Sequence, residues 1–471
     1  MRSCAGAVAL LAFVALSPSA ALGNGRAPLT NGIHFRPGDP HSLYVASTFG
    51  LLVSHDDGCT FRWICEQSIG YGGTFDPKYR VAADGTIFAT TFDGLRVSRD
   101  GGCSFTTATS ALPAGDPSRI ADTWIDAIDI GPTGDIWVAT ADGAKPNNVF
   151  RSTDNGVTFA PRGMLSQEIW WKSVAIAPSR AQRIYVTGYQ VTGALAGGGA
   201  MPPTAHFEIT DDDGASWTES PLAGVRFGST PLVYALGIDR SNPDLVLMSS
   251  AGANPPNGDR LYRSIDGGMT WTEVLATPGT LLDLAVAPSG VVMVATLGGA
   301  FQSIDNGATF SPMIDAPQLA CIGQRDDGEI YGCGANWEPD FKAVASSRDG
   351  RTWDKTFRFV DLAGPIECPA DSPQHLQCDG MWPAVQVQFG ATGPTSCGGH
   401  PLSDDTPPPD APPPTDATVS PPADVAPPLV KPQPGGCCDT ASASSGQLGA
   451  LGLLAAVCGA VLLRRRRGAP E

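Results

Sequence analysis

An eight-residue motif that recurs along the chain is the feature that most constrains its fold. In residues 152–159 it reads Ser-Thr-Asp-Asn-Gly-Val-Thr-Phe, and the shared pattern is Ser/Thr-x-Asp-x-Gly-x-Ser/Thr-Phe/Trp. Six copies are complete, and a seventh, at residues 347–353, is one residue short between its Asp and its Trp. We call each copy a box. The box aspartates are Asp56, Asp100, Asp154, Asp212, Asp266, Asp305 and Asp349.

The residue types of the box predict a tight turn. An Asp two residues before a Gly accepts hydrogen bonds from backbone N–H groups ahead of it. The Gly supplies the positive φ that a short hairpin needs. The first hydroxyl can tie the two arms together, and the final aromatic ring packs over the turn. Each box is therefore expected to join two antiparallel strands, with its Asp in a structural role.

The spacing of the boxes predicts a β-propeller. The aspartates are separated by 44, 54, 58, 54, 39 and 44 residues. These steps suit four-stranded blades with their loops, at about 40–50 residues a repeat. Two apolar runs joined by a turn precede each box, as in residues 127–140 and 283–296. The predicted fold is an all-β, seven-bladed β-propeller with four-stranded blades over residues 24–400.

The boxes resemble the BNR or Asp-box repeat of sialidases, sortilin-type receptors, xyloglucan-cleaving glycosidases and photosystem II assembly factors. The resemblance covers roughly residues 30–360. It implies the propeller fold and a structural role for the box aspartates. It indicates no single function, because enzymes and non-enzymes share the repeat.

The N-terminal end of the chain is typical of an export signal, and the C-terminal end is typical of a sorting segment. Residues 1–23 are typical of a secretory signal peptide, so we expect an exported protein in which disulfides form. Residues 401–434 are rich in proline and acid and predict a disordered linker. Residues 435–471 combine Cys437 and Cys438, an apolar run at 448–463 and four arginines.

This C-terminal arrangement resembles the MYXO-CTERM sorting signal of myxobacterial surface proteins. The resemblance implies cleavage near Cys437 or Cys438 by a membrane-embedded sorting protease and delivery to the cell surface. Before processing, a transmembrane helix at 448–463 would hold the chain in the membrane, with the arginines in the cytoplasm. We expect a protein at the cell surface, in the outer membrane or outside the cell. An ordinary membrane anchor is the alternative.

The cysteines between the signal peptide and the tail predict at least one disulfide bond. Cys321 and Cys333 flank a turn and face each other in hairpin register, so we expect them to pair. The next candidates by proximity are Cys368 with Cys378 and Cys59 with Cys65, although many pairings are possible. The sequence has no CxxC motif and its histidines show no ligand spacing, so we expect no metal and no cofactor.

The longest loops are expected on one rim of the propeller. This rim, which we call the crossover rim, carries the connections between blades and the loops from the second strand to the third. Aromatic residues with polar neighbours suit contact with a sugar or a protein. The alternative is that Trp124 and Trp171 plug the channel. The predicted ligand-binding residues are Tyr71, Trp124, Asp126, Glu168, Trp170, Trp171, Tyr189 and Trp337. Beyond the last box, residues 385–389 alternate as in a strand that closes the ring or covers an edge.

We expect a non-catalytic binding module for a surface glycan or protein, and not an enzyme. The net charge of −17 argues against nucleic acid. One alternative is an Asp-box glycoside hydrolase that uses a carboxylate pair from the rim. The sialidase motif Phe-Arg-Ile-Pro is absent, since residues 34–37 read His-Phe-Arg-Pro. Another alternative is an assembly factor or receptor-like propeller. For the glycoside hydrolase alternative, the candidate catalytic carboxylates are Asp122, Asp126, Glu168, Glu338 and Asp340.

Overall fold

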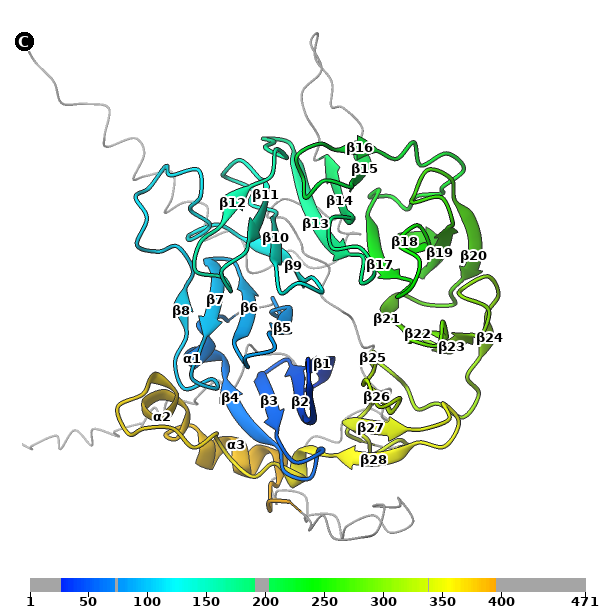
Figure 1. Cartoon of the computed structure of the whole chain (residues 1–471). Helices are drawn as coiled ribbons and strands as arrows, with labels where there is room; N and C mark the ends of the chain where they lie inside the picture. Colours follow the sequence, from blue (N-terminus) through cyan, green and yellow to red (C-terminus); the bar gives the residue numbers. More distant parts are fainter. Residues whose placement is uncertain (1–26, 73–74, 191–202, 338, 395–471) are drawn as a thin grey trace, which may run out of the picture. The chain divides into compact units, whose positions relative to one another are not determined.

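The protein is a seven-bladed β-propeller. The computed structural model describes residues 27–72, 75–190, 203–337 and 339–394, and within them the chain forms seven four-stranded sheets. The first strands of successive blades contact one another, and β25 of the last blade contacts β1, so the ring is closed. Figure 1 shows these first strands lining the centre. The predicted fold class and blade number are confirmed.

Each blade is an antiparallel meander of four consecutive strands. The bounds in blades 1 and 2 are β1 (Thr30–Arg36), β2 (Asp39–Ser47), β3 (Gly50–Ser54), β4 (Arg62–Cys65), β5 (Tyr79–Val81), β6 (Ile87–Thr91), β7 (Gly94–Ser98) and β8 (Thr106–Thr107). Those in blades 3 and 4 are β9 (Ile125–Ile130), β10 (Ile136–Thr140), β11 (Val149–Ser152), β12 (Ala160–Pro161), β13 (Ile169–Ile176), β14 (Ile184–Gln190), β15 (Thr204–Thr210) and β16 (Thr218–Glu219).

The last three blades follow the same plan. Blades 5 and 6 contain β17 (Val233–Ile238), β18 (Val246–Asn254), β19 (Gly258–Ser264), β20 (Thr272–Ala276), β21 (Leu281–Val286), β22 (Val292–Thr296), β23 (Gly299–Ser303) and β24 (Ser311–Pro312). Blade 7 contains β25 (Cys321–Gln324), β26 (Ile330–Cys333), β27 (Val344–Ser347) and β28 (Asp354–Phe357).

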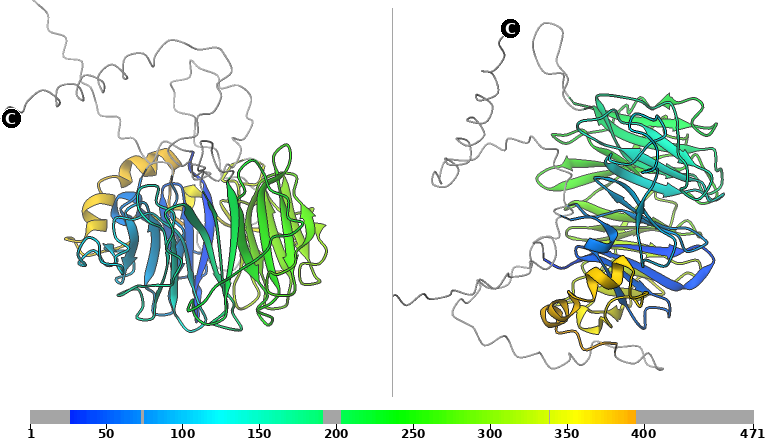
Figure 2. Two further views of the ribbon diagram at one scale, coloured as in Figure 1. Left: turned by 90° about the horizontal axis from the view of Figure 1, so that it is seen from above. Right: turned by 90° about the vertical axis from the view of Figure 1, so that its left-hand side faces the viewer.

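The core lies between neighbouring blades, because each sheet is packed on both faces. Every residue of β10 and of β22 is buried, so these strands are continuous apolar runs rather than alternating ones. Between blades 3 and 4 the contacts include Trp137, Trp171 and Ile184. Outer strands such as β16 are short and exposed. Figure 2 shows the blades side-on, with the strands running between the two rims.

Every box lies at the turn from the third strand of a blade to the fourth, as predicted. In the third box the Ser152 hydroxyl donates to Oδ1 of Asp154 at 2.8 Å, and the Gly156 N–H donates to the Ser152 oxygen at 2.9 Å. The Thr158 N–H also donates to Oδ1 of Asp154, at 2.9 Å. Gly156 has a φ of 77°. The short box keeps this pattern through Asp349, which accepts from the Thr352 N–H at 2.7 Å.

A C-terminal segment packs against blades 1 and 2. It contains a 3-10 turn at Phe359–Asp361, α2 (Pro373–Cys378) and α3 (Trp382–Phe389), while α1 (Glu66–Ile69) follows β4. Residues 385–389 are therefore helical, and the strand expected there is wrong. Pro383 lies in the first turn of this helix, where its missing N–H is tolerated, and Gly390 ends the helix in the left-handed conformation.

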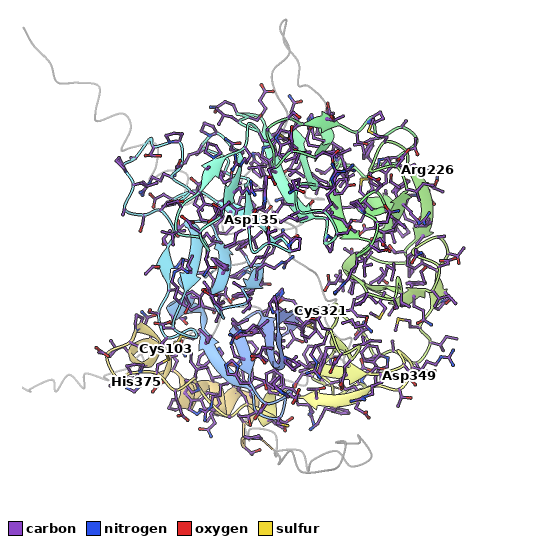
Figure 3. The ribbon with its side chains drawn as sticks, viewed as in Figure 1. Cys103, Asp135, Arg226, Cys321, Asp349 and His375 are labelled. Atoms are coloured by element: carbon purple, nitrogen blue, oxygen red, sulfur yellow. A yellow bond between two sulfur atoms is a disulfide. The ribbon has the colours of Figure 1, made fainter. Side chains whose placement is uncertain are left out.

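Disulfide bonds tie this segment to the propeller. Cys65 pairs with Cys378 and Cys103 with Cys368. Figure 3 labels Cys103 beside His375, which belongs to α2. The expected pairs Cys368–Cys378 and Cys59–Cys65 are wrong, because the fold brings together cysteines that are 313 and 265 residues apart in sequence.

The predicted Cys321–Cys333 disulfide is confirmed, with an S–S distance of 2.05 Å across the β25–β26 pair. Bonds of this kind persist in oxidising compartments, so the protein is exported.

The predicted signal peptide, the proline-rich linker, Cys437, Cys438 and the apolar run at 448–463 lie outside the described residues. Among the residues that the structure describes, no helix is both long enough and apolar enough to span a bilayer.

Candidate functional site

Five aromatic side chains form a row on the crossover rim of blades 2 to 4. Phe75 precedes β5, Phe92 lies at the β6–β7 turn, and Trp124 precedes β9. Trp170 is in β13 and Tyr189 is in β14. The ring centroids are separated by 4.8 Å from Phe75 to Phe92, 4.9 Å from Phe92 to Trp124, and 5.9 Å from Trp124 to Trp170 and from Trp170 to Tyr189. We call these residues the aromatic row.

The row combines anchored and accessible rings. Trp124 is 6% exposed and Phe92 is 47% exposed, while the other three rings are half-buried. The row therefore offers apolar ring surface at the rim while its centre is fixed by packing. Aromatic surface of this kind suits stacking against the apolar face of a sugar ring.

A buried ion pair lies beneath the row. The Lys172 ammonium group contacts the Asp126 carboxylate, and their side chains are 1% and 3% exposed. Nζ of Lys172 also lies 4.6 Å from the centroid of the Trp124 ring, within range of a cation–π interaction. Burial lowers the pKa of Lys172, and the Asp126 carboxylate opposes this shift.

Lys78 joins this pair from blade 2. Its Nζ donates to the Asp126 carbonyl at 2.6 Å and lies 3.5 Å from Oδ1 of Asp126. The carboxylate of Asp126 is thus enclosed by two cations from neighbouring inner strands. A carboxylate held in this way supports the rim and has no accessible oxygen for a substrate.

Two other carboxylates flank the aromatic row. Glu168 is exposed, and it accepts a hydrogen bond at 2.7 Å from Gln190, the residue after Tyr189. Asp142 is half-buried in the β10–β11 loop and accepts from the backbone N–H groups of Trp124 and Ala144 at 3.2 and 2.8 Å.

The loops that carry these carboxylates are fixed to each other. The backbones of Asn147 and Ser166 exchange hydrogen bonds of 2.7 and 2.9 Å between the two loops. A Cβ atom added to Gly143 would lie 3.4 Å from Cζ2 of Trp170, so the Asp142 loop touches that ring. Asp142 and Glu168 are therefore both held next to the aromatic row.

The predicted ligand-binding residues divide into two groups. Trp124, Trp170 and Tyr189 belong to the row, and Asp126 and Glu168 adjoin it. Tyr71 packs against the core between blades 1 and 2, where burial raises its pKa. Trp171 is 2% exposed, and its Nε1–H donates to the Met164 carbonyl at 3.0 Å. Trp337 lies in the β26–β27 connection of blade 7, outside the row.

Five residues at the rim, Phe75, Lys78, Phe92, Asp142 and Lys172, were not predicted from the sequence to belong to the site. Phe92 is an apolar residue at the tip of a tight turn, and Lys172 is a single cation in the apolar strand β13. Both features are visible in the sequence and are unusual for a purely structural role. Phe75, Lys78 and Asp142 carry no such local signal, because only the packing of the blades places them here.

Comparison with known proteins gives enzymes among the relatives, while no protein-family model matches the sequence. The chain is 28% identical over 158 residues to the xyloglucanase Xgh74A of Acetivibrio thermocellus, which is 30% of this chain and 16% of the relative. It is 25% identical over 255 residues to a xyloglucanase of Hypocrea jecorina, which is 46% of this chain and 30% of the relative. The chain spans less than a third of the length of these curated relatives.

Solved structures of propeller proteins are similar in fold. The GH74 xyloglucanase of Xanthomonas campestris has a TM-score of 0.40 at 15% identity, covering 69% of this chain and 66% of that one. An ancestral GH74 enzyme has a TM-score of 0.47 at 15% identity, covering 66% of this chain and 44% of that one.

These relatives correct two expectations from the sequence. The prediction of a non-catalytic binding module is wrong, because the curated relatives are named as enzymes and not as binding proteins. The prediction that the chain is not an enzyme is wrong for the same reason. The two predictions were wrong because the boxes indicate only the fold, whereas the loops on the rim determine the chemistry.

Proposed function

We propose that the protein is a glycoside hydrolase that cleaves a β-linked glucan lying across the crossover rim. The similarity to two xyloglucanases supports the enzyme class and a glucan-based substrate. Because the matched segments are 16% and 30% of those relatives, the activity of this chain is our inference.

The aromatic row is the observation that carries the proposal. Its rings extend across blades 2 to 4: Phe75, Phe92 and Trp124 form a cluster with centroids 4.8 to 5.8 Å apart, and Trp170 and Tyr189 continue from Trp124 in steps of 5.9 Å. The sugar rings of a polysaccharide have apolar faces and edges of hydroxyl groups. The aromatic rings of the row can stack on the faces, and the neighbouring polar side chains can hydrogen-bond the hydroxyl groups. An extended substrate lying along the row would pass over Trp170 and close to Asp142 and Glu168.

Glycoside hydrolysis requires two carboxyl groups that flank the scissile bond. We assign the general acid to Glu168, which is exposed and can reach a bound glycosidic oxygen. We assign the second role to Asp142, whose carboxylate is oriented by the N–H groups of Trp124, Ala144 and Lys145. Asp142 would attack the anomeric carbon directly or activate a water molecule.

Asp126 has no part in this chemistry. Its carboxylate is 3% exposed and is held by Lys172 and Lys78. Its role is to fix β9, which follows Trp124, and β13, which contains Trp170.

The proposal extends to the boxes and to the C-terminal tail. We propose that the boxes are Asp-box repeats and that residues 435–471 are a MYXO-CTERM-like sorting signal. Residues 401–434 would then be a disordered linker that precedes the sorting signal. The intact mass of surface-derived protein tests the tail. Loss of residues 448–463 supports sorting by a protease, and their retention means an ordinary anchor.

Hydrolysis of defined polysaccharides tests the enzymatic proposal. The full chain would be incubated separately with xyloglucan, unsubstituted β-1,4-glucan and a sialylated glycan, and new reducing ends would be counted. We expect release from at least one of the two glucans and none from the sialylated glycan. Binding to a glucan without any release of reducing ends would refute the proposal.

A further inference from the structure

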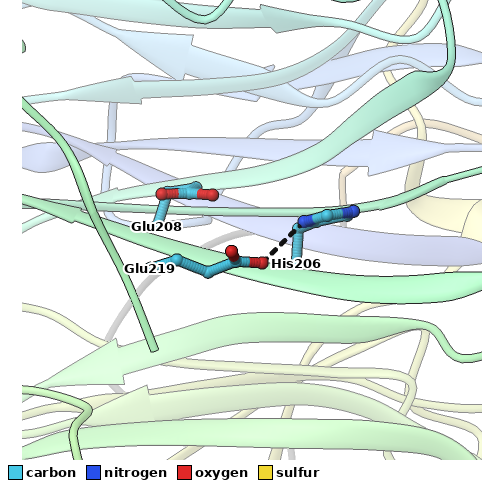
Figure 4. Close-up of side chains that lie close together, drawn as sticks. All are labelled: His206, Glu208 and Glu219. Atoms are coloured by element: carbon cyan, nitrogen blue, oxygen red, sulfur yellow. Dashed lines mark hydrogen bonds and ion pairs between the residues drawn. The ribbon is translucent and has the colours of Figure 1, made fainter. Parts of the chain in front are cut away.

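Three side chains that can bind a metal ion meet on the outer strands of blade 4, β15 and β16. His206 and Glu208 are two residues apart on β15, so they point to the same face of the sheet. Glu219, on β16, is the direct cross-strand partner of Glu208. One donor atom from each of the three side chains lies within 4.8 Å of the other two. Figure 4 shows the three side chains close together on the β15–β16 pair, with one nitrogen of His206 directed at Glu219.

The two carboxylates face each other, and among the ion pairs of the described residues only the His206 imidazole reaches them, at 2.8 Å from Glu219. Like charges directly opposite on neighbouring strands destabilise a sheet. Among the described residues, Glu208 makes no side-chain hydrogen bond or ion pair. A bound cation would offset the repulsion between the Glu208 and Glu219 carboxylates.

His206 is the third member of the group. Its Nδ1 lies 2.8 Å from Oε1 of Glu219, and the side chain is 15% exposed. The ring packs against Trp171, with 6.4 Å between the centroids, so the position of the imidazole is fixed from the core. The second ring nitrogen, Nε2, is buried and has no hydrogen-bond partner within the described part of the chain. Nδ1 is the ring nitrogen that faces the carboxylates, so it is the atom that would bind an ion together with them, while Nε2 points away from the two glutamates.

We propose that His206, Glu208 and Glu219 bind a divalent transition-metal ion of the zinc class. One imidazole and two carboxylates are a donor set that Zn²⁺ accepts, with the fourth position left to water. Ca²⁺ prefers six to eight oxygen ligands and Mg²⁺ an oxygen octahedron, so neither suits a site with a histidine and two carboxylates. The ion would neutralise the opposed carboxylates.

The expected role of the ion is to secure the edge of blade 4. β16 consists of Thr218 and Glu219 only, and both residues are exposed. An ion held jointly by β15 and β16 would cross-link this short edge strand to its neighbour. The site is separate from the aromatic row, so it stands whether or not the protein cleaves glucans.

Zinc titration of the full chain, followed by calorimetry and by thermal unfolding, tests the site. The wild type is compared with Glu208→Gln and His206→Gln, and with His41→Gln as a matched control. His41 also lies 2.7 Å from a carboxylate, that of Asp57, but belongs to no three-residue cluster found among the described residues. The difference between the wild type and each variant removes any contribution from cysteines elsewhere in the chain.

We expect a tight Zn²⁺ site in the wild type and in His41→Gln, with a melting temperature that rises on addition of Zn²⁺ and not of Ca²⁺ or Mg²⁺. Loss of a direct ligand should weaken binding by more than the roughly 10–100-fold that removal of an outer-sphere partner costs. Glu208→Gln also removes the charge repulsion, so its metal-free form should be folded and at least as stable as the wild type. Equal Zn²⁺ affinity in the wild type and both cluster variants, or no binding in the wild type, would overturn the proposal.

Discussion

Nζ of Lys172 lies 4.6 Å from the centroid of the Trp124 ring while the same ammonium group contacts the Asp126 carboxylate. The pair connects the inner strands of blades 3 and 4 directly beneath the aromatic row. Because the two side chains are almost completely buried, the cost of removing one partner is the cost of an uncompensated charge in the interior.

Asp126→Asn is therefore expected to lower the free energy of unfolding by about 3–5 kcal/mol. It leaves Lys172 buried and charged without its carboxylate partner. The double variant Asp126→Leu with Lys172→Met should recover most of this loss, since a well-packed apolar pair replaces both charges. Chemical denaturation of the three proteins checks the prediction, and equal losses in the single and double variants would contradict it.

Trp170 and Trp171 are adjacent in sequence, but we expect substitution of Trp170 to affect glucan binding and substitution of Trp171 to affect stability. Trp170→Ala removes a half-buried ring of the row, so it should weaken glucan binding and raise KM with little effect on stability. Trp171→Ala removes a core side chain and should cost about 3–5 kcal/mol in stability. Binding isotherms and denaturation curves for both variants separate the roles. A glucan affinity that is unchanged in Trp170→Ala would show that the row is not the binding surface.

The box aspartates are expected to act on stability alone. Asp154→Ala leaves the N–H groups of Val157 and Thr158 without their acceptor, and should cost about 1–3 kcal/mol. Val157→Ala at the same turn is the control, since its side chain is 59% exposed and its loss should change stability by less than about 0.5 kcal/mol. Equal melting temperatures for the two variants would rule out the structural role.

Glu208 should make stability depend on pH. Its pKa is raised from 4.5 to about 7 in the folded protein, so between these values the folded state holds a proton that the unfolded chain has released. Stability in metal-free buffer should therefore fall as pH rises through this window. Glu208→Gln has no carboxyl group to titrate at this position but keeps the neighbouring Glu219 and His206. The difference in melting temperature between this variant and the wild type should therefore grow with pH. A constant difference in melting temperature from pH 4.5 to 8 would contradict the assignment.

The fold was predictable from the sequence because the box acts locally. Asp154, Gly156 and Thr158 make their hydrogen bonds within one turn, and the same residues recur at every blade. The C-terminal segment was not predictable in this way. Residues 385–389 alternate like a strand, but packing against blade 1 and Pro383 in the first turn favour a helix. The Cys65–Cys378 bond depends on closure of the ring, which no local pattern reports.

The candidate site was predictable only in part. Long rim loops rich in aromatic residues indicated Trp124, Trp170 and Tyr189, which the fold brings together. Asp126 appeared to be a functional carboxylate because nothing in the sequence shows that Lys172, on the next blade, neutralises it. The His206–Glu208–Glu219 group was missed because Glu219 joins it only through the register of β15 with β16.

The most direct test of the central claim is the rate of glucan cleavage by the wild type, Glu168→Gln and Asp315→Asn. Glu168 is the proposed general acid, and Asp315 is an exposed carboxylate on the connection between blades 6 and 7. General acid catalysis contributes about 10²–10⁴-fold, so kcat should fall by that order in Glu168→Gln and stay unchanged in Asp315→Asn. If the wild type releases reducing ends and Glu168→Gln does so at the same rate, the assigned site is wrong; if the wild type releases none, the protein is not a glucan hydrolase.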